Sequence, residues 1–92
     1  MALALTRGAA LPNFTFVMTS ASSHAPTSGL TVSGKISKDG GAFAALTNTP
    51  TEIGFGFYKV TITSGETDAV VLALRMTASG ADDLGIVLLT QS

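Results

Sequence analysis

Short stretches of the chain alternate between hydrophobic and polar residues, which is the pattern of a β-strand with one buried face. The clearest example is residues 30–37, where Leu30, Val32 and Ile36 alternate with small polar residues and a lysine. By the same criterion, strands are predicted at residues 13–18, 30–37, 42–46, 51–53, 57–63, 69–78 and 86–90. Seven short strands at regular spacing predict an all-β sandwich or small barrel, and a length of 92 residues matches a single sandwich domain.

Two glycine-containing turns define the hairpins of this sandwich. Asp39-Gly40 fits a type I′ turn, in which both central residues have positive φ, and predicts a hairpin over residues 30–46. Further along, Gly54 and Gly56 flank a single residue and predict a sharp reversal between two strands.

The strand after this second reversal is expected to contribute side chains to the core. Its alternation places Tyr58 on the inward face, so we expect this side chain to be mostly buried. The strand ends at Thr63, which is followed three residues later by Glu66. This spacing is that of a capping box and predicts one short helical turn over residues 64–68.

The first residues of the chain leave two interpretations open. Residues 2–6 alternate leucine and alanine, as an edge strand or an arm would, and a frayed terminus explains them equally well. We therefore expect one sandwich domain over residues 1–92, with residues 1–12 as an arm or an edge strand. Arg7 interrupts the apolar stretch and no positive residue precedes it, so we expect this segment to belong to the mature protein rather than to a signal peptide.

The composition indicates a binding protein without nucleic-acid, metal or membrane chemistry. Charged residues make up 12% of the chain, about half the usual ~25%, which suggests that other subunits cover part of the surface. The net charge of −1 and the scattered lysines argue against nucleic-acid binding. Without cysteine and with one histidine, the chain lacks a zinc ligand set, and no cofactor is expected. No stretch approaches the ~20 apolar residues of a membrane span.

The residues that could carry catalysis are few and isolated. His24 lies in a polar loop next to two serines, but a triad is assembled from separate elements, so we interpret it as a solvated loop residue. Asp82 and Asp83 are carboxylates in a turn without EF-hand spacing, and no calcium site is predicted. We predict that the protein is not an enzyme.

Three hydrophobic positions are candidate interface residues: Leu3, Leu5 and Phe55. Turn tips are normally polar, so Phe55 either folds back to cap the end of the sandwich or stays exposed for a partner. The uncharged strand face around Val71 and Ala73 has the same two interpretations, ordinary burial or an oligomer interface.

Several motifs occur in an order that resembles a known family. They are residues 37–43 (SKDGGAF), 51–58 (TEIGFGFY), 63–68 (TSGETD) and 77–82 (TASGAD), with residues 16–18 and 29–31 upstream. Together they resemble a β-sandwich module of tailed-bacteriophage structural proteins, found in head decoration, fibre and baseplate proteins. The resemblance covers nearly the whole chain and implies an immunoglobulin-like fold.

The resemblance carries further implications for individual residues. Position 55 is usually polar in the module, so Phe55 is a departure that suggests a partner-specific contact. The pair Gly56 and Tyr58 also resembles the tyrosine corner of immunoglobulin-like folds, in which a tyrosine hydroxyl bonds to nearby backbone.

The resemblance implies a virion protein made in the cytoplasm of a bacterial host. Because the module fills the chain from Met1, we expect a capsid decoration (cement) protein that binds the major capsid protein, or other virion proteins, as a homo-oligomer. The alternative is a tail, fibre or baseplate adaptor that binds host-surface carbohydrate, although the sequence has no Trp and one Tyr for sugar stacking.

Overall fold

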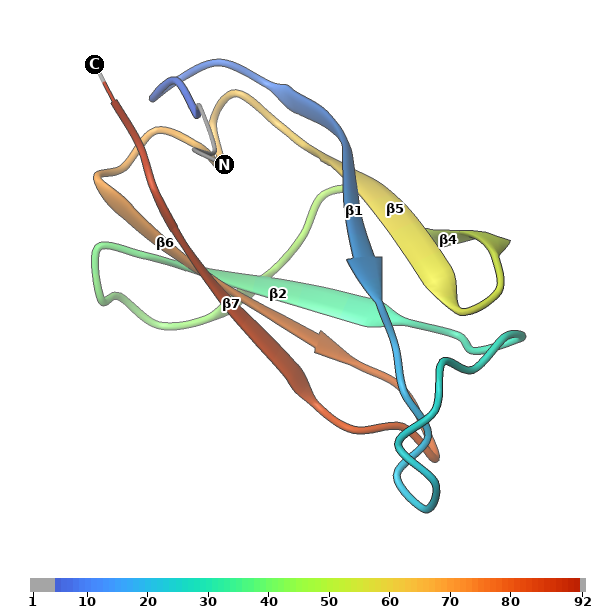
Figure 1. Ribbon diagram of the computed structural model, residues 1–92. Helices are drawn as coiled ribbons and strands as arrows, with labels where there is room; N and C mark the ends of the chain where they lie inside the picture. Colours follow the sequence, from blue (N-terminus) through green and yellow to red (C-terminus); the bar gives the residue numbers. More distant parts are fainter. Residues whose placement is uncertain (1–4, 92) are drawn as a thin grey trace.

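The computed structural model describes residues 5–91, which form seven antiparallel strands in two sheets. The strands are β1 (Leu11–Val17), β2 (Ser33–Lys38), β3 (Ala44–Ala45), β4 (Thr51–Gly54), β5 (Phe57–Ile62), β6 (Val71–Thr77) and β7 (Leu84–Leu89). One sheet has the order β1-β5-β4 and the other β3-β2-β6-β7. Figure 1 shows the two sheets as two layers. The fold is therefore the predicted seven-stranded β-sandwich.

The strand order is that of an immunoglobulin-like sandwich. β1, β5 and β4 occupy the places of strands B, E and D, and β3, β2, β6 and β7 those of C′, C, F and G. The segment before β1 takes the place of the first strand, because Thr6 forms a parallel bridge with Gln91 beyond the end of β7.

The core fills the space between the sheets with residues from β1, β2, β5, β6 and β7 and from the segments next to them. It consists of Leu5, Phe16, Met18, Val32, Ile36, Tyr58, Val60, Ile62, Ala69, Leu72, Leu74, Met76 and Leu88. The alternation that predicted β5 and β6 selects these side chains, since successive residues of a strand point to opposite faces. Phe16 and Tyr58 are cross-strand partners whose rings stack at 6.1 Å between centroids.

The first predicted hairpin forms, but with a shorter second strand. Asp39 and Gly40 both have positive φ, and Gly41 N–H donates to the Lys38 carbonyl at 3.0 Å, as a type I′ turn requires. Only Ala44 and Ala45 pair with β2. The side chain of Asp39 also bonds to the N–H groups of Val70 and Val71, so the turn is fixed to the start of β6.

The predicted capping box forms at the end of β5. The carboxylate of Glu66 accepts a hydrogen bond from Thr63 N–H at 2.8 Å, and Glu66 N–H donates to Thr63 Oγ1. Thr67 N–H donates to the Thr63 carbonyl, which closes a single helical turn.

No helix within residues 5–91 is long and apolar enough to cross a membrane.

The hydroxyl of Tyr58 bonds to backbone, but not in the way the sequence suggested. Tyr58 is 1% exposed, and its hydroxyl donates to the Thr27 carbonyl at 2.9 Å and accepts from Leu30 N–H at 3.1 Å. These partners lie 31 and 28 residues upstream, whereas a tyrosine corner bonds a few residues upstream from strand F. The tyrosine-corner prediction is therefore wrong, because Tyr58 lies on β5 and fixes the loop before β2.

We predict that Tyr58→Phe lowers the free energy of unfolding by about 1 kcal/mol, because two backbone groups lose their partner. Tyr58→Ala should lower it by about 3–5 kcal/mol, because it also leaves a cavity. Urea denaturation followed by far-UV circular dichroism measures both, since the chain has no Trp and Tyr58 is its one Tyr. Equal stability of the wild type and Tyr58→Ala would contradict this packing.

Candidate binding site at the β4–β5 hairpin

The β4–β5 hairpin places a phenylalanine in a backbone conformation that suits glycine or asparagine. Gly54 pairs with Phe57, so Phe55 and Gly56 form a two-residue turn with φ of 56° and 85°. Positive φ at both positions is the type I′ pattern, for which Asn-Gly is preferred. The left-handed conformation costs a bulky residue about 1–2 kcal/mol. The turn therefore holds Phe55 under local strain.

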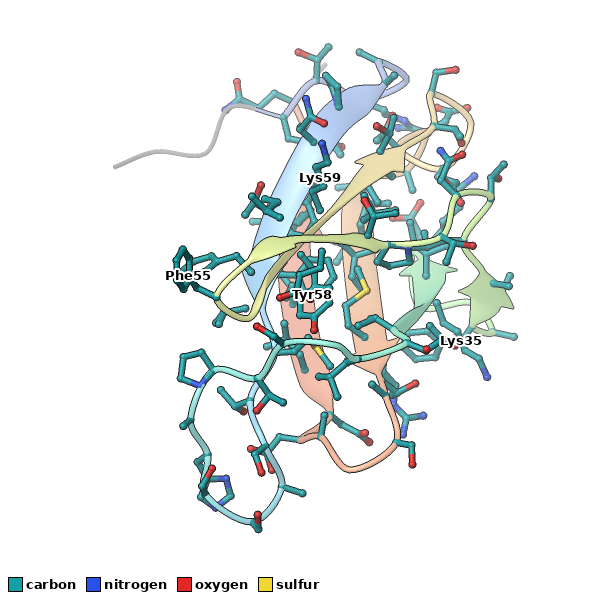
Figure 2. All side chains as sticks on the ribbon, turned by 90° about the vertical axis from the view of Figure 1, so that its right-hand side faces the viewer. Lys35, Phe55, Tyr58 and Lys59 are labelled. Carbon is teal, nitrogen blue, oxygen red and sulfur yellow. The ribbon has the colours of Figure 1, made fainter. Side chains whose placement is uncertain are left out.

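The side chain of Phe55 gains no compensating burial within the chain. It is 90% exposed, the highest value among the exposed large hydrophobic residues of the described chain. Figure 2 shows its ring pointing away from the sandwich, whereas Tyr58 points into it. The structure therefore contradicts the interpretation in which Phe55 folds back to cap the end of the sandwich.

The hairpin tip is held against the loop between β1 and β2. Gly56 lies so close to this loop that an added Cβ would come within 2.7 Å of Thr27 N and 2.8 Å of Pro26 Cβ. The carbonyl of Gly56 accepts a hydrogen bond from Met18 N–H at 3.0 Å. Only glycine satisfies both the positive φ and this close approach, so the backbone next to Phe55 is fixed in place.

Glu52 adds a second connection between the hairpin and the same loop. Its carboxylate accepts hydrogen bonds from Gly29 N–H at 2.9 Å and from Gly56 N–H at 3.4 Å. The bond from Gly29, followed by one from the Ser28 side chain, lowers the pKa of Glu52. The role of Glu52 could not be predicted from the sequence, because its partner Gly29 lies 23 residues away and no local pattern marks such a contact.

Two further hydrophobic side chains are exposed on the hairpin. Ile53 is the extra residue of a β-bulge, since Glu52 pairs with Tyr58 and Gly54 with Phe57. Ile53 and Phe57 are both about half exposed. We call Ile53, Phe55 and Phe57 the hairpin tip cluster; all three are apolar, exposed side chains at or next to the turn.

The other predicted interface residues lie elsewhere. Leu3 falls outside the described residues, and Leu5 belongs to the core at 3% exposure, so Leu5 does not offer a free contact surface. Val71 is partly exposed on the outer face of β6, beside Ala73.

His24 and Asp83, two of the residues considered in the sequence, take part in separate side-chain contacts. His24 Nδ1 lies 2.7 Å from Asp82, which also accepts a hydrogen bond from Thr19 Oγ1, and these bonds lower the pKa of Asp82. Asp83 pairs with Arg75. Within residues 5–91, no three His, Asp or Glu side chains are grouped closely enough to hold a metal ion. These contacts fasten loops at the end of the sandwich.

A polar hollow of about 410 Å³ lies on the outer face of the sheet that contains β4 and β5. It is lined by Asn13, Asn48, Thr49, Thr51, Lys59, Val60 and Thr61. Amide and hydroxyl groups of this kind can bind a polar ligand, but no aromatic side chain lines the hollow to stack against a sugar ring.

No protein family, curated protein or solved structure that was compared with the chain matches it.

We predict that Phe55→Asn raises the free energy of unfolding by about 1 kcal/mol, because asparagine tolerates the left-handed conformation. Phe55→Ala is the control: it removes the ring but keeps a strained Cβ, so it should stay within about 0.5 kcal/mol of the wild type. Chemical denaturation measures both variants. Destabilisation by Phe55→Asn would mean that the ring packs against the protein.

We predict that Glu52→Gln is less stable than the wild type at neutral pH and that the difference shrinks on acidification. The pKa of Glu52 is lowered by folding, so its contribution is present above the unfolded value near 4.5 and is lost as pH falls through the lower folded value. Urea denaturation of both proteins at several pH values measures the difference. A difference that stays constant from neutral to strongly acidic pH would refute the role of the carboxylate.

Proposed function

We propose that the protein is a non-catalytic virion structural protein of a tailed bacteriophage, a capsid decoration protein that binds and stabilises the assembled head shell. The observation that carries the proposal is the exposed Phe55 on a strained, firmly anchored turn. A contact with a partner would account for a residue that opposes folding and whose side chain is almost fully exposed. The choice of partner rests on the resemblance to phage virion modules.

The mechanism is insertion of the hairpin tip cluster into an apolar depression of the major capsid protein. Burying a side chain such as Phe55 stabilises a complex by about 1.5–3 kcal/mol. Because Glu52 and Gly56 already fix the backbone, binding orders only the side chain and loses little conformational entropy. Many copies bind one shell, and each copy adds a small contribution to the stability of the shell.

The proposal places the mature protein on the virion, after synthesis in the bacterial cytoplasm. Its partner is the major capsid protein or a neighbouring virion protein, and neither nucleic acid nor a membrane takes part. The low proportion of charged residues is consistent with surfaces that are covered in the assembled particle.

The alternative is a tail, fibre or baseplate adaptor that binds host carbohydrate. The polar hollow beside Lys59 and Thr51 is the observation that favours it. A glycan-binding screen distinguishes the two proposals, because decoration does not require sugar binding.

We predict that the purified protein binds undecorated capsids saturably and raises the melting temperature of the shell, because a ligand stabilises the state that it binds. Phe55→Asn should bind at least about 30-fold more weakly, as expected for loss of an aromatic anchor. Co-sedimentation and scanning calorimetry measure binding and shell stability.

Phe43→Ala is the matched control for this experiment. Phe43 is also half exposed, but it precedes β3 in the other sheet, so its removal should leave shell binding unchanged. Undiminished binding by Phe55→Asn would reject the hairpin tip as the contact. Absence of any binding by the wild type would reject the decoration role.

A further inference from the structure

The polar hollow on the outer face of the sheet β1-β5-β4 has the size and lining of a small-molecule site. Its volume of about 410 Å³ falls within the range of roughly 300–1,000 Å³ that is typical of ligand pockets. Apart from Val60, its lining side chains carry amide, hydroxyl or ammonium groups: Asn13, Asn48, Thr49, Thr51, Lys59 and Thr61. These groups donate and accept hydrogen bonds, so they suit a ligand that is rich in hydroxyl groups.

A β-bulge in β1 forms one side of the hollow. Two residues of β1, Pro12 and Asn13, lie opposite the single residue Thr61 of β5. Asn13 has a φ of 54°, in the left-handed region that asparagine tolerates better than most residues. Thr15 Oγ1 donates a hydrogen bond to the Asn13 carbonyl at 2.9 Å, which holds the bulge. Bulges often redirect a side chain next to a functional site, and here Asn13 and Thr61 both line the hollow.

The loop between β3 and β4 forms the opposite side of the hollow and is fixed by hydrogen bonds. The side-chain amide of Asn48 donates to the Thr61 carbonyl at 2.8 Å. One residue earlier, Thr47 N–H donates to the Glu66 carboxylate at 2.9 Å. Pro50, just before β4, is buried. Because both sides are held before a ligand arrives, binding orders little of the protein and loses little conformational entropy.

Lys59 gives the hollow a positive charge that the chain leaves free. It lies on the outer face of β5 and is exposed (Figure 2). Arg7 and Arg75 form ion pairs with carboxylates, whereas Lys59 forms none within residues 5–91. Among the described residues that line the hollow, it carries the only charge. A carboxylate brought into the hollow would therefore meet an unopposed ammonium group.

We propose that this hollow binds an acidic sugar, a pyranose unit that carries a carboxylate. The ammonium group of Lys59 pairs with the carboxylate, and the amides and threonine hydroxyls bind the ring hydroxyls. Charge selects among anionic ligands, because a phosphate group carries about 1.5 to 2 negative charges, whereas one lysine matches a single charge. A charge-assisted hydrogen bond also replaces the stacking on an aromatic side chain that the described lining does not offer.

Recognition of an acidic sugar is a narrower form of the alternative function, carbohydrate binding, and rests on it, whereas shell binding is independent. None of the residues that line the hollow belongs to the hairpin tip cluster. The two activities can therefore be tested on the same protein with variants of different residues.

Heteronuclear NMR titration of the purified protein at neutral pH tests the proposal, with glucuronic, galacturonic and N-acetylneuraminic acid as probes. Glucose, which lacks the carboxylate, and acetate, which lacks the ring hydroxyls, are the matched control ligands. At least one acidic sugar should shift the backbone amide signals of the lining residues saturably and bind at least about tenfold more tightly than either control. Added salt should weaken this binding, because Lys59 is exposed.

Lys59→Gln should weaken binding of the acidic sugar at least about tenfold, because the new amide still forms hydrogen bonds but carries no charge. Lys35→Gln is the control variant. Lys35 is an exposed lysine on β2 in the other sheet, so its replacement should leave binding unchanged (Figure 2). Amide spectra that match the wild type away from each substitution show that both variants fold.

Each contrary result overturns the proposal in a different way. Equal binding of glucose would leave the alternative function standing but reject a charged ligand, and equal binding of acetate would reject a sugar site. Tighter binding of glucose phosphate than of every acidic sugar would assign the hollow to phosphate. Absence of shifts with all three acidic sugars, or equal loss in Lys59→Gln and Lys35→Gln, would reject the site, while co-sedimentation with capsids still decides the decoration role.

Discussion

The buried hydroxyl of Tyr58 connects the core of the sandwich to the loop between β1 and β2, and the candidate site depends on both. Its ring packs between the sheets against Phe16, while its oxygen bonds to both Thr27 and Leu30. The loop held in this way forms the wall against which Gly56 packs and supplies the N–H group of Gly29 to Glu52. A buried polar atom must be satisfied, so the position of this loop follows from the position of one core side chain. The orientation of the hairpin tip follows in turn.

The hairpin tip combines local strain with strong support from its surroundings. The left-handed backbone at Phe55 opposes folding, but the hydrogen bonds of Glu52 and Met18 and the close contact at Gly56 allow no alternative turn. Residues in such conformations persist only when neighbouring contacts determine them. The same arrangement explains why the tip can be apolar in a small domain: the ring contributes nothing to the core, so core packing does not determine the residue type at this position. The stability of the turn and the partner contact proposed above therefore make opposite demands on this position.

The sequence was sufficient for features that depend on neighbouring residues. Alternation located every strand to within a few residues, Asp39-Gly40 predicted its turn type, and Thr63 with Glu66 predicted a reciprocal cap. It was insufficient where contacts join distant segments. Neither the bond from Gly29 to Glu52 nor the partners of the Tyr58 hydroxyl has a local signal, because the topology brings these segments together. For the same reason Leu5 was assigned to a surface but lies in the core.

The bridge between Thr6 and Gln91 brings both ends of the described chain to one pole of the sandwich. At the same pole, Gly8 N–H donates to the Thr67 carbonyl and the Thr67 hydroxyl donates to Ala9, next to the end of β5 that is remote from Phe55. A domain whose ends meet can be spliced into a surface loop of a host protein through short linkers without being stretched. The sandwich is thus suited to serve as an inserted display unit, with the aromatic turn presented at the far end from the junction.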